Sequence, residues 1–351
     1  RQSSAASDVY KRQIFDTAEI TNVSLSASGG GAEGRYLLSA NYLKQEGVII
    51  GNTGFERVGT RLNSEFKIGD NLTVSENLNI TYDKEGTTTG NAIQNAAFSS
   101  PLVPVYDTNG NFAGTYSNAA RVGIANNPVA DLIRGQDDYN KNLRVIGDIS
   151  LKWQITPQLS FKSQAGITMR DLNGRYFNAL NPEHGEAISN NTLTEQSFRQ
   201  DQWVVSNILN YKNSFGDHTL DVLVATEATK ENFKGFGALR TNYLFEDDSF
   251  YLLSNGAGVP VIDYASSSST SIFSLLATAN WSYGGKYFGQ LTVRKDDTSR
   301  FAKATSDAIF PSGNLSWIAS NEDWFDSSVF DTLKFRVSYG ELGNQSVGIS
   351  T

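Results

Sequence analysis

The feature that most constrains this chain is an alternation of apolar and polar residues over unusually long segments. In the segment 55–68, Val58 and Leu62 occupy even-numbered positions, whereas Arg61 and Glu65 occupy odd-numbered ones. Successive side chains of a β-strand point to opposite faces, so a period of two predicts strands with one apolar and one charged face. We therefore expect an all-β, antiparallel chain.

The alternation recurs in about twelve segments. Turn residues such as Gly69, Asp70 and Asn71 separate neighbouring segments and favour a series of hairpins. Glu76 is an exception, because it falls on a face that is otherwise apolar. The expected strands lie near residues 21–28, 36–42, 55–68, 72–83, 143–153, 159–169, 203–211, 219–229, 271–283, 287–296, 310–318 and 333–339.

The lengths of strands and connections favour a membrane barrel over a soluble sandwich. Soluble strands average ~5–6 residues, whereas a tilted strand that crosses a membrane needs ~9–11, as many of these segments offer. Short periplasmic turns and long extracellular loops are typical of an antiparallel transmembrane β-barrel, which we expect here. Tight turns alternate with long connections, the former at 69–71, 156–158, 215–218 and 283–286 and the latter at 84–140, 172–200 and 230–270.

Aromatic residues support the same orientation of the strands. Five of them lie within a few residues of the tight turns, namely Trp153, Phe161, Tyr211, Tyr283 and Tyr287. We interpret this row as an aromatic girdle at the periplasmic interface, the alternative being the general preference of aromatic residues for strands. No run of ~18 apolar residues occurs, which excludes a transmembrane helix and leaves a barrel open.

Composition excludes several classes of function. The chain of 351 residues has a formal net charge of −8, which argues against nucleic acid as the partner. It has no cysteine, so a disulfide framework, a thiolate metal site and a thiol nucleophile are excluded. Residues 1–13 show neither periodicity nor the pattern of a signal peptide. We interpret them as a non-native leader and expect the barrel segment to begin at Ile14.

One glycine motif has the spacing of a dinucleotide-binding fingerprint. Gly29, Gly31 and Gly34 fit G-x-G-x-x-G, whose glycines let a helix N-terminus approach a pyrophosphate. A strand pattern follows here, whereas the fingerprint requires a helix. We therefore expect a hairpin turn at these glycines.

A second motif resembles the start of a calcium loop. Asp107, Asn109 and Asn111 alternate as oxygen ligands would, but Phe112 and Asn118 occupy positions where such a loop needs Gly and Glu. We prefer a hairpin turn at residues 109–110, inside a long loop.

Catalytic and metal chemistry find little support in the sequence. His184 and His218 are the only imidazoles, and they lie in a loop and a tight turn with no second imidazole nearby. The chain has no G-x-S-x-G elbow. We expect no enzyme activity, no catalytic residue, no metal site and no cofactor.

The long loops combine aromatic residues with acidic ones. Aromatic faces stack on sugar rings and carboxylates accept hydrogen bonds from hydroxyl groups, so these residues could contact a glycan or a peptide. Ordinary solvated loop chemistry explains them equally well. The residues concerned are Asp137, Asp138, Tyr139, Tyr243, Phe245, Glu246, Asp247, Asp248 and Tyr251.

Four segments carry a recognisable pattern, namely 22–49, 285–302, 310–325 and 333–348. In the first, an S-G-G turn at 28–30 precedes a Tyr-rich strand and Gln-Glu-Gly at 45–47, and the last contains Gly-Asn-Gln at 343–345. Taken in this order, the segments resemble the barrel of the SusC/RagA family of TonB-dependent outer-membrane transporters of Bacteroidota.

The resemblance implies a central fragment of a larger protein. Family members hold a plug inside a barrel of about twenty-two strands, of which residues 14–351 would supply about twelve. It also implies coupling to the TonB complex, pairing with a SusD-like surface lipoprotein, contact with outer-membrane lipid, and import of oligosaccharides or peptides. We expect the plug, the TonB-contacting segment and the signal sequence to lie outside this chain. The alternatives are a passive porin or secretion barrel, and a soluble β-rich glycan-binding or adhesin domain.

Overall fold

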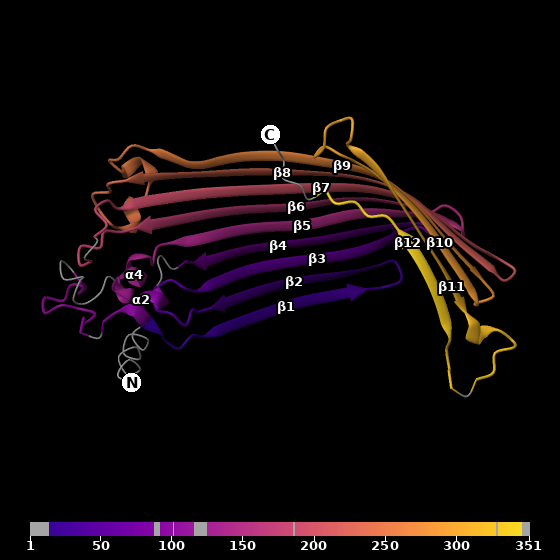
Figure 1. Cartoon of the computed structure of the whole chain (residues 1–351), viewed down its shortest axis with the longest axis horizontal. Helices are drawn as coiled ribbons and strands as arrows, with labels where there is room; N and C mark the ends of the chain where they lie inside the picture. The colour runs from indigo at the N-terminus through magenta and orange to yellow at the C-terminus, as the bar shows by residue number, and fades with distance from the viewer. Residues whose placement is uncertain are drawn as a thin grey trace.

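A computed structural model describes residues 14–87, 92–100, 102–115, 125–184, 187–327 and 329–345. The twelve expected strands are all present and form one antiparallel sheet in sequence order, each strand pairing with its neighbours in the chain (Figure 1). The fold is thus the expected antiparallel meander. The strands are β1 (Ile20–Gly30), β2 (Gly34–Gln45), β3 (Phe55–Ile68), β4 (Leu72–Gly86), β5 (Tyr139–Gln154), β6 (Leu159–Asn178), β7 (Thr192–Phe215), β8 (His218–Thr241), β9 (Val261–Tyr283), β10 (Tyr287–Thr298), β11 (Asp307–Ile318) and β12 (Lys334–Gly340).

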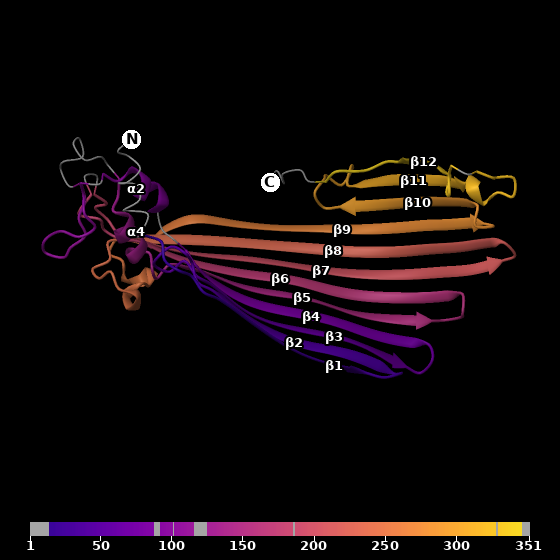
Figure 2. The same cartoon turned by 90° about the horizontal axis from the view of Figure 1, so that it is seen from below.

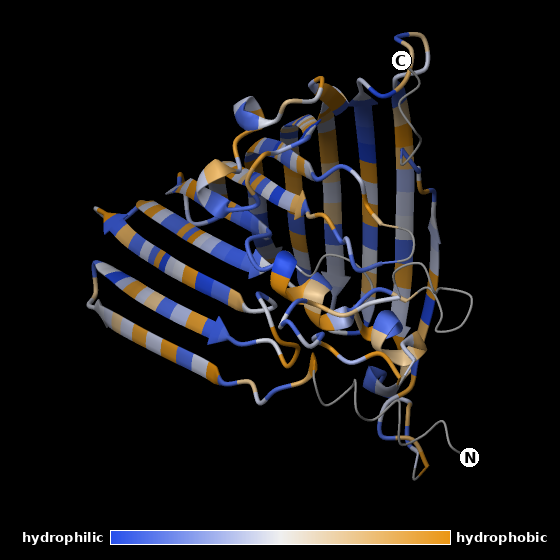
Figure 3. Cartoon of the chain, turned by 90° about the vertical axis from the view of Figure 1, so that its left-hand side faces the viewer, coloured by the Kyte–Doolittle hydropathy of each residue, from blue (hydrophilic) through white to orange (hydrophobic). Residues whose placement is uncertain are grey.

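The sheet is strongly curved and open. The strands run side by side along the long axis of the molecule, with helical loops at one end and tight turns at the other (Figures 1 and 2). Viewed from the loop end, the strands form a curved, open sheet, and the loops lie in front of its open side (Figure 3). An open sheet of twelve strands with this curvature has the shape of part of a barrel wall.

The register places most of the large apolar residues of the central strand segments on one face. In antiparallel pairs, partner residues point to the same side of the sheet. Leu62 is opposite Leu78, Trp153 is opposite Phe161, and Val224 is opposite Leu209. Glu76 pairs with Ser64 and Ile149 on this same face, so the sequence placed it correctly.

The two faces differ in crowding as well as polarity. Apolar-face residues such as Leu38 and Val58 are about half exposed, at 51% and 50%, although they are large and hydrophobic. On the polar face, Asn142, Ser150 and Ser274 are only 8%, 7% and 3% exposed to solvent. Side chains converge on the concave side of a curved sheet and splay apart on the convex side, so the polar face is the inner one.

The apolar face forms a band of nearly constant height. It extends over about ten residues on β4, β8 and β9, from Leu72 to Tyr82, His218 to Ala228 and Tyr283 to Phe273. Ten residues span roughly 33 Å along a strand, or about 25 Å of height at a tilt of ~40°, which is the height of the apolar band of a transmembrane barrel.

Aromatic residues line the turn-side edge of this band, as predicted. Tyr283 pairs with both Tyr287 and His218, and Tyr287 pairs with Trp317. Rings of Tyr287 and Trp317 stack with centroids 6.5 Å apart. A second aromatic row, which the sequence analysis did not identify, marks the loop-side edge and contains Tyr42, Tyr82, Trp203 and Phe273.

Several connections differ from expectation. Long loops were expected at 172–200 and 230–270, but the observed loops are shorter and cover 179–191 and 242–260. The reason is that β6, β7, β8 and β9 continue as strands into the segments expected to be loops. Beyond the apolar band polar and apolar residues occur on both faces of these strands, so the period of two disappears while the backbone hydrogen-bond ladder continues. The connection at 319–333 is long although it lies at the turn end, and it contains the short helix η4 (Ala319–Asn321).

The loops fold into two small cores. One contains Ile14 with residues of the short helices α2 (Ala92–Phe98) and α4 (Pro128–Arg134), which lie within the expected loop 84–140. Asn127 caps α4 by accepting hydrogen bonds from the amides of Val129 and Ala130. The other packs Tyr243, Tyr251 and Leu253 against Phe177 and Leu193 on the convex side of the sheet. These residues come from the segment 243–255, which includes η2 (Asp248–Phe250) and η3 (Leu253–Asn255). None of the helices in the described ranges is long and apolar enough to cross a membrane.

Candidate functional site: the inner wall of the sheet

Both short motifs adopt the turns that the sequence predicts. Gly30 ends β1 and Gly34 begins β2, so the glycine motif is a hairpin turn followed by a strand. Asp107 Oδ1 accepts hydrogen bonds from the amides of Asn109 and Asn111 at 2.8 and 2.9 Å, and Gly110 has φ +85°. These bonds from backbone N–H groups, that of Asn111 first, lower the pKa of the Asp107 carboxyl. The Asp107 carboxylate thus stabilises the turn by accepting hydrogen bonds from its backbone amides.

The two histidines lie in different surroundings. His218 is on the convex face, where its Nδ1 accepts a hydrogen bond from Trp281 Nε1 at 3.1 Å and its ring packs on Tyr283. His184 lies in the loop between β6 and β7, and its backbone amide donates a hydrogen bond to the carbonyl of Asn181. Within the described ranges no cluster of three His, Asp or Glu side chains could hold a metal ion.

Several loop residues proposed as ligand contacts are buried instead. Asp138, Tyr243 and Tyr251 are 1%, 6% and 4% exposed. Tyr251 stacks on Phe177 at 3.9 Å between ring centroids, and the Phe177 amide donates to Asp138 Oδ1 at 2.6 Å. These three residues stabilise the loop core and are out of reach of a ligand, whereas Phe245 remains 52% exposed.

Burial raises the pKa of the Asp138 carboxyl to about 7. The hydrogen bond from Phe177 and the nearby Arg175 guanidinium oppose this effect, while Asp137 adds to it. The second carboxyl oxygen, Oδ2, has no hydrogen-bond partner. A buried carboxyl without a cation to pair with is more stable in its neutral form.

The inner wall carries hydrogen-bonded polar networks that join neighbouring strands. Asp148 accepts from Asn77 Nδ2 at 3.2 Å and from Gln164 Nε2 at 3.1 Å, which joins β4, β5 and β6. In the same way, Asn142 donates to Asp83 at 3.3 Å and accepts from Arg170 Nε at 3.1 Å. Cross-strand networks of this kind hold polar side chains in fixed positions on a hydrophilic surface.

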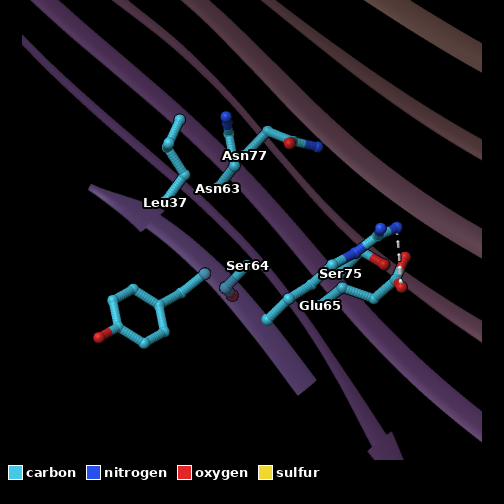
Figure 4. Close-up of a pocket in the computed structure, with 8 residues that line it drawn as sticks. Leu37, Asn63, Ser64, Glu65, Ser75 and Asn77 are labelled. Carbon is cyan, nitrogen blue, oxygen red and sulfur yellow. Dashed lines mark ion pairs between the residues drawn. The ribbon is translucent and has the colours of Figure 1, made fainter. Parts of the chain in front are cut away.

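A shallow hollow of about 380 Å³ opens on the inner wall close to the turn end. Asn63 and Asn77 lie side by side there, and Glu65 forms an ion pair with Arg35 at 3.1 Å (Figure 4). The hollow is open, and most of the residues that line it are polar. It suits contact with another polar surface better than enclosure of a small molecule.

Aromatic side chains gather higher on the inner wall, beyond the apolar band. Phe198 stacks on Tyr264 with centroids 5.2 Å apart and lies 6.2 Å from the Phe233 ring. Gly237, opposite Tyr264, leaves space for this ring, because a Cβ at Gly237 would lie 2.4 Å from Tyr264 Cε1. The Tyr264 hydroxyl is covered and has no hydrogen-bond partner. We call Phe198, Phe233 and Tyr264 the aromatic patch.

The aromatic patch was not predicted from the sequence. Its three members fall in the segments 172–200 and 230–270, which were expected to be loops, so no register was available to place them on a common face. The hint was the pair of glycines at 235 and 237 between aromatic residues, since glycine within a strand often marks the close approach of a neighbouring group.

Comparison with known proteins gives the sequence a family context. No family model matches the chain. It is 28% identical to TonB-dependent receptor P3 of Formosa agariphila over 350 residues, covering 96% of this chain and 34% of that protein. It is 26% identical to TonB-dependent receptor SusC of Bacteroides thetaiotaomicron over 367 residues, covering 97% and 35%. The chain thus spans about a third of the length of these relatives.

Solved structures agree in fold. The RagAB peptide transporter superposes with a TM-score of 0.77 at 22% identity, over 97% of this chain and 38% of that one. The ferric preacinetobactin receptor of Acinetobacter baumannii gives a TM-score of 0.51 at 13% identity, over 87% and 44%. The ordered meander and the two-faced strands agree with these comparisons: over nearly its whole length the chain is similar to TonB-dependent receptors, SusC among them, and it shares the fold of the RagAB transporter.

Proposed function

We propose that the protein containing this chain imports a nutrient, an oligosaccharide or a peptide, across the outer membrane of a Gram-negative bacterium of the Bacteroidota type. The observation that carries the proposal is the pairing of a convex apolar band, about 25 Å high and edged by aromatic residues, with a concave hydrogen-bonded polar wall. Lipid would contact the first face and cargo the second.

In this proposal the inner wall divides into two parts. Its polar networks, near Asp148 and in the hollow beside Glu65, would face a plug domain supplied by other sequence. The aromatic patch lies beyond the membrane level, where cargo would enter, and its ring faces suit stacking on sugars or on the side chains of a peptide. No covalent chemistry is required of either part.

In this proposal, partner proteins would supply the energy for transport and help to capture the cargo. Relatives named TonB-dependent receptors and the RagAB transporter support coupling to the TonB complex and pairing with a SusD-like surface lipoprotein. Uptake of labelled cargo by cells that lack TonB discriminates this proposal from a passive porin or secretion barrel. Uptake that persists without TonB would favour the passive alternative.

Substitutions in the aromatic patch test the cargo role. We expect Phe198→Ala and Phe233→Ala to weaken cargo binding by about five- to tenfold each, which corresponds to a loss of ~1–1.5 kcal/mol per aromatic contact. Phe236→Ala is the matched control, because Phe236 lies on the same strand as Phe233 but on the convex face. Equal losses in all three variants would contradict a role for the inner wall.

Fractionation tests the membrane proposal itself. The complete gene product should be recovered in the outer-membrane fraction and should need detergent to become monodisperse, since many large apolar side chains of the convex face are exposed. Recovery as a monodisperse protein in water would favour the soluble glycan-binding alternative.

A further inference from the structure

The convex face has an asymmetric distribution of charge. On the described strands, every lysine and arginine that points to this face lies on the loop side of the apolar segment of its own strand. Lys295 is the least distant of them from the band, because it is directly opposite Leu275 on β9. The turn-side edge of the band contains no lysine or arginine on these strands. The residues of this basic belt are Lys44, Lys84, Lys141, Arg175, Arg199, Lys230, Lys234, Arg240 and Lys295.

Lysines occur directly at the edge of the band. On β2, β4 and β5 the last apolar residues on the convex face are Tyr42, Tyr82 and Leu143, and the next residue on that face is Lys44, Lys84 or Lys141. The same holds for Lys230 on β8 and Lys295 on β10. If the band spans hydrocarbon, these ammonium groups lie at the level of the lipid headgroups in the outer leaflet. The inference rests on the proposed membrane location in this respect.

Lys84 and Lys141 form the most concentrated part of the belt. They are directly opposite each other on β4 and β5. Their ammonium nitrogens lie 5.8 and 3.9 Å from the ring centroid of Tyr139, and the Arg175 guanidinium carbon lies 4.8 Å from the same centroid. Three cations thus surround one aromatic ring on the convex side of the sheet.

Neighbouring acidic groups balance only part of the charge of the two lysines. Glu56 on β3 is directly opposite Lys84, and Asp137 interacts with Lys84 electrostatically. Arg175 pairs with Asp248, and Lys44 pairs with Glu46 at 3.2 Å. Lys84 and Lys141 form no ion pair within the described part of the chain, although the chain as a whole is acidic. Like charges directly opposite each other in a sheet destabilise it, so this arrangement favours a bound anion. An anion with several oxygens can accept hydrogen bonds from both ammonium groups.

We propose that Lys84 and Lys141, with Tyr139, form a binding site for the phosphate-bearing headgroup of an outer-leaflet lipid. Cargo and plug face the opposite side of the sheet, so neither can supply the anion. The aromatic ring covers the boundary between headgroup and acyl chains, while the two ammonium groups bind the phosphate. Juxtamembrane lysines attract anionic lipid surfaces in this way.

The test uses the complete gene product in detergent, titrated with short-chain phosphatidic acid and with phosphatidylcholine, and read by native mass spectrometry. Lys84→Gln combined with Lys141→Gln should weaken binding of phosphatidic acid roughly 30-fold, about fivefold for each lysine. Binding of phosphatidylcholine should change little, because its choline cation already neutralises the phosphate and the headgroup has no net negative charge. The control combines Lys152→Gln with Lys162→Gln, a cross-strand lysine pair on the inner face of β5 and β6.

Three results would overturn the proposal. The first is equal loss in both double variants, and the second is no loss in either. The third is competition by inorganic phosphate at the same concentration as phosphatidic acid, which would identify a site for free phosphate. Failure of the membrane location is distinguishable, because the protein would then be monodisperse without detergent. If only the headgroup site fails, the protein stays in the membrane fraction and both double variants bind lipid as the parent does.

Discussion

Replacement of Val224 by arginine tests the two-faced barrel wall most directly. Val224 is on the convex face of β8, pairs with Leu209 and Ala277, and is 42% exposed. It lies about six residues from both His218 and Lys230, at the two edges of the band, which is roughly 20 Å along the strand in either direction. At a tilt of ~40° this corresponds to about 15 Å of depth, the middle of a ~30 Å hydrocarbon core.

The expected cost follows from this depth. Arginine at the midplane on the lipid face of a barrel destabilises it by about 2–4 kcal/mol, which shifts the unfolding equilibrium roughly 30- to 900-fold. Leu223→Arg is the matched control on the neighbouring residue. Leu223 pairs with Asn210 and Thr278 on the polar inner face, so its substitution should cost less than about 1 kcal/mol.

Equilibrium unfolding by denaturant in lipid vesicles measures both variants of the complete gene product. The free energy of unfolding should fall strongly for Val224→Arg and little for Leu223→Arg. Equal costs, or a larger cost at Leu223, would refute the assignment of the convex face to lipid. A soluble sheet with both faces wet would tolerate arginine at Val224.

Three further predictions concern single side chains. Because burial raises the pKa of Asp138 to about 7, the folded loop binds a proton more tightly than the unfolded one, so its stability should increase as pH falls from about 7 towards 4. Hydrogen exchange at the Phe177 amide should show up to about tenfold more protection per pH unit, beyond the intrinsic effect, and Asp138→Asn should abolish this slope. Arg134→Met should leave the Glu183 carboxylate, which is 5% exposed, without its cation, and this should destabilise the loop by about 3–5 kcal/mol. Proteolysis of residues 87–138 should therefore become faster, and an unchanged rate would contradict the prediction. Glu76→Leu should raise the free energy of unfolding in vesicles by about 1 kcal/mol, because a carboxylate on the apolar face opposes lipid contact, and a loss of stability would show that Glu76 is needed there.

The positions of the strands follow from the sequence because an amphipathic strand has a strict period. Alternation located all twelve strands, and the facing of Val58, Leu62 and even the exceptional Glu76 was predicted correctly. Tight turns could be located too, since Gly69 and Gly110 adopt positive φ values that favour glycine. The aromatic row beside these turns was likewise readable from sequence.

Features outside the apolar band needed the tertiary structure. Above the band polar residues occur on both faces of β7, β8 and β9, so alternation ends although the strands continue. Phe198, Phe233 and Tyr264 therefore could not be assigned to one face from the sequence. Loop residues such as Asp138 and Tyr251 look solvated in sequence, yet packing against the convex side buries them.

The sequence by itself therefore determined the strand order, the facing of the strands and the position of the tight turns, because these depend on local periodicity and backbone geometry. Only the tertiary structure decided which residues meet across strands. The opposition of Lys84 and Lys141 depends on register across a connection of about fifty residues, and no local pattern encodes that register.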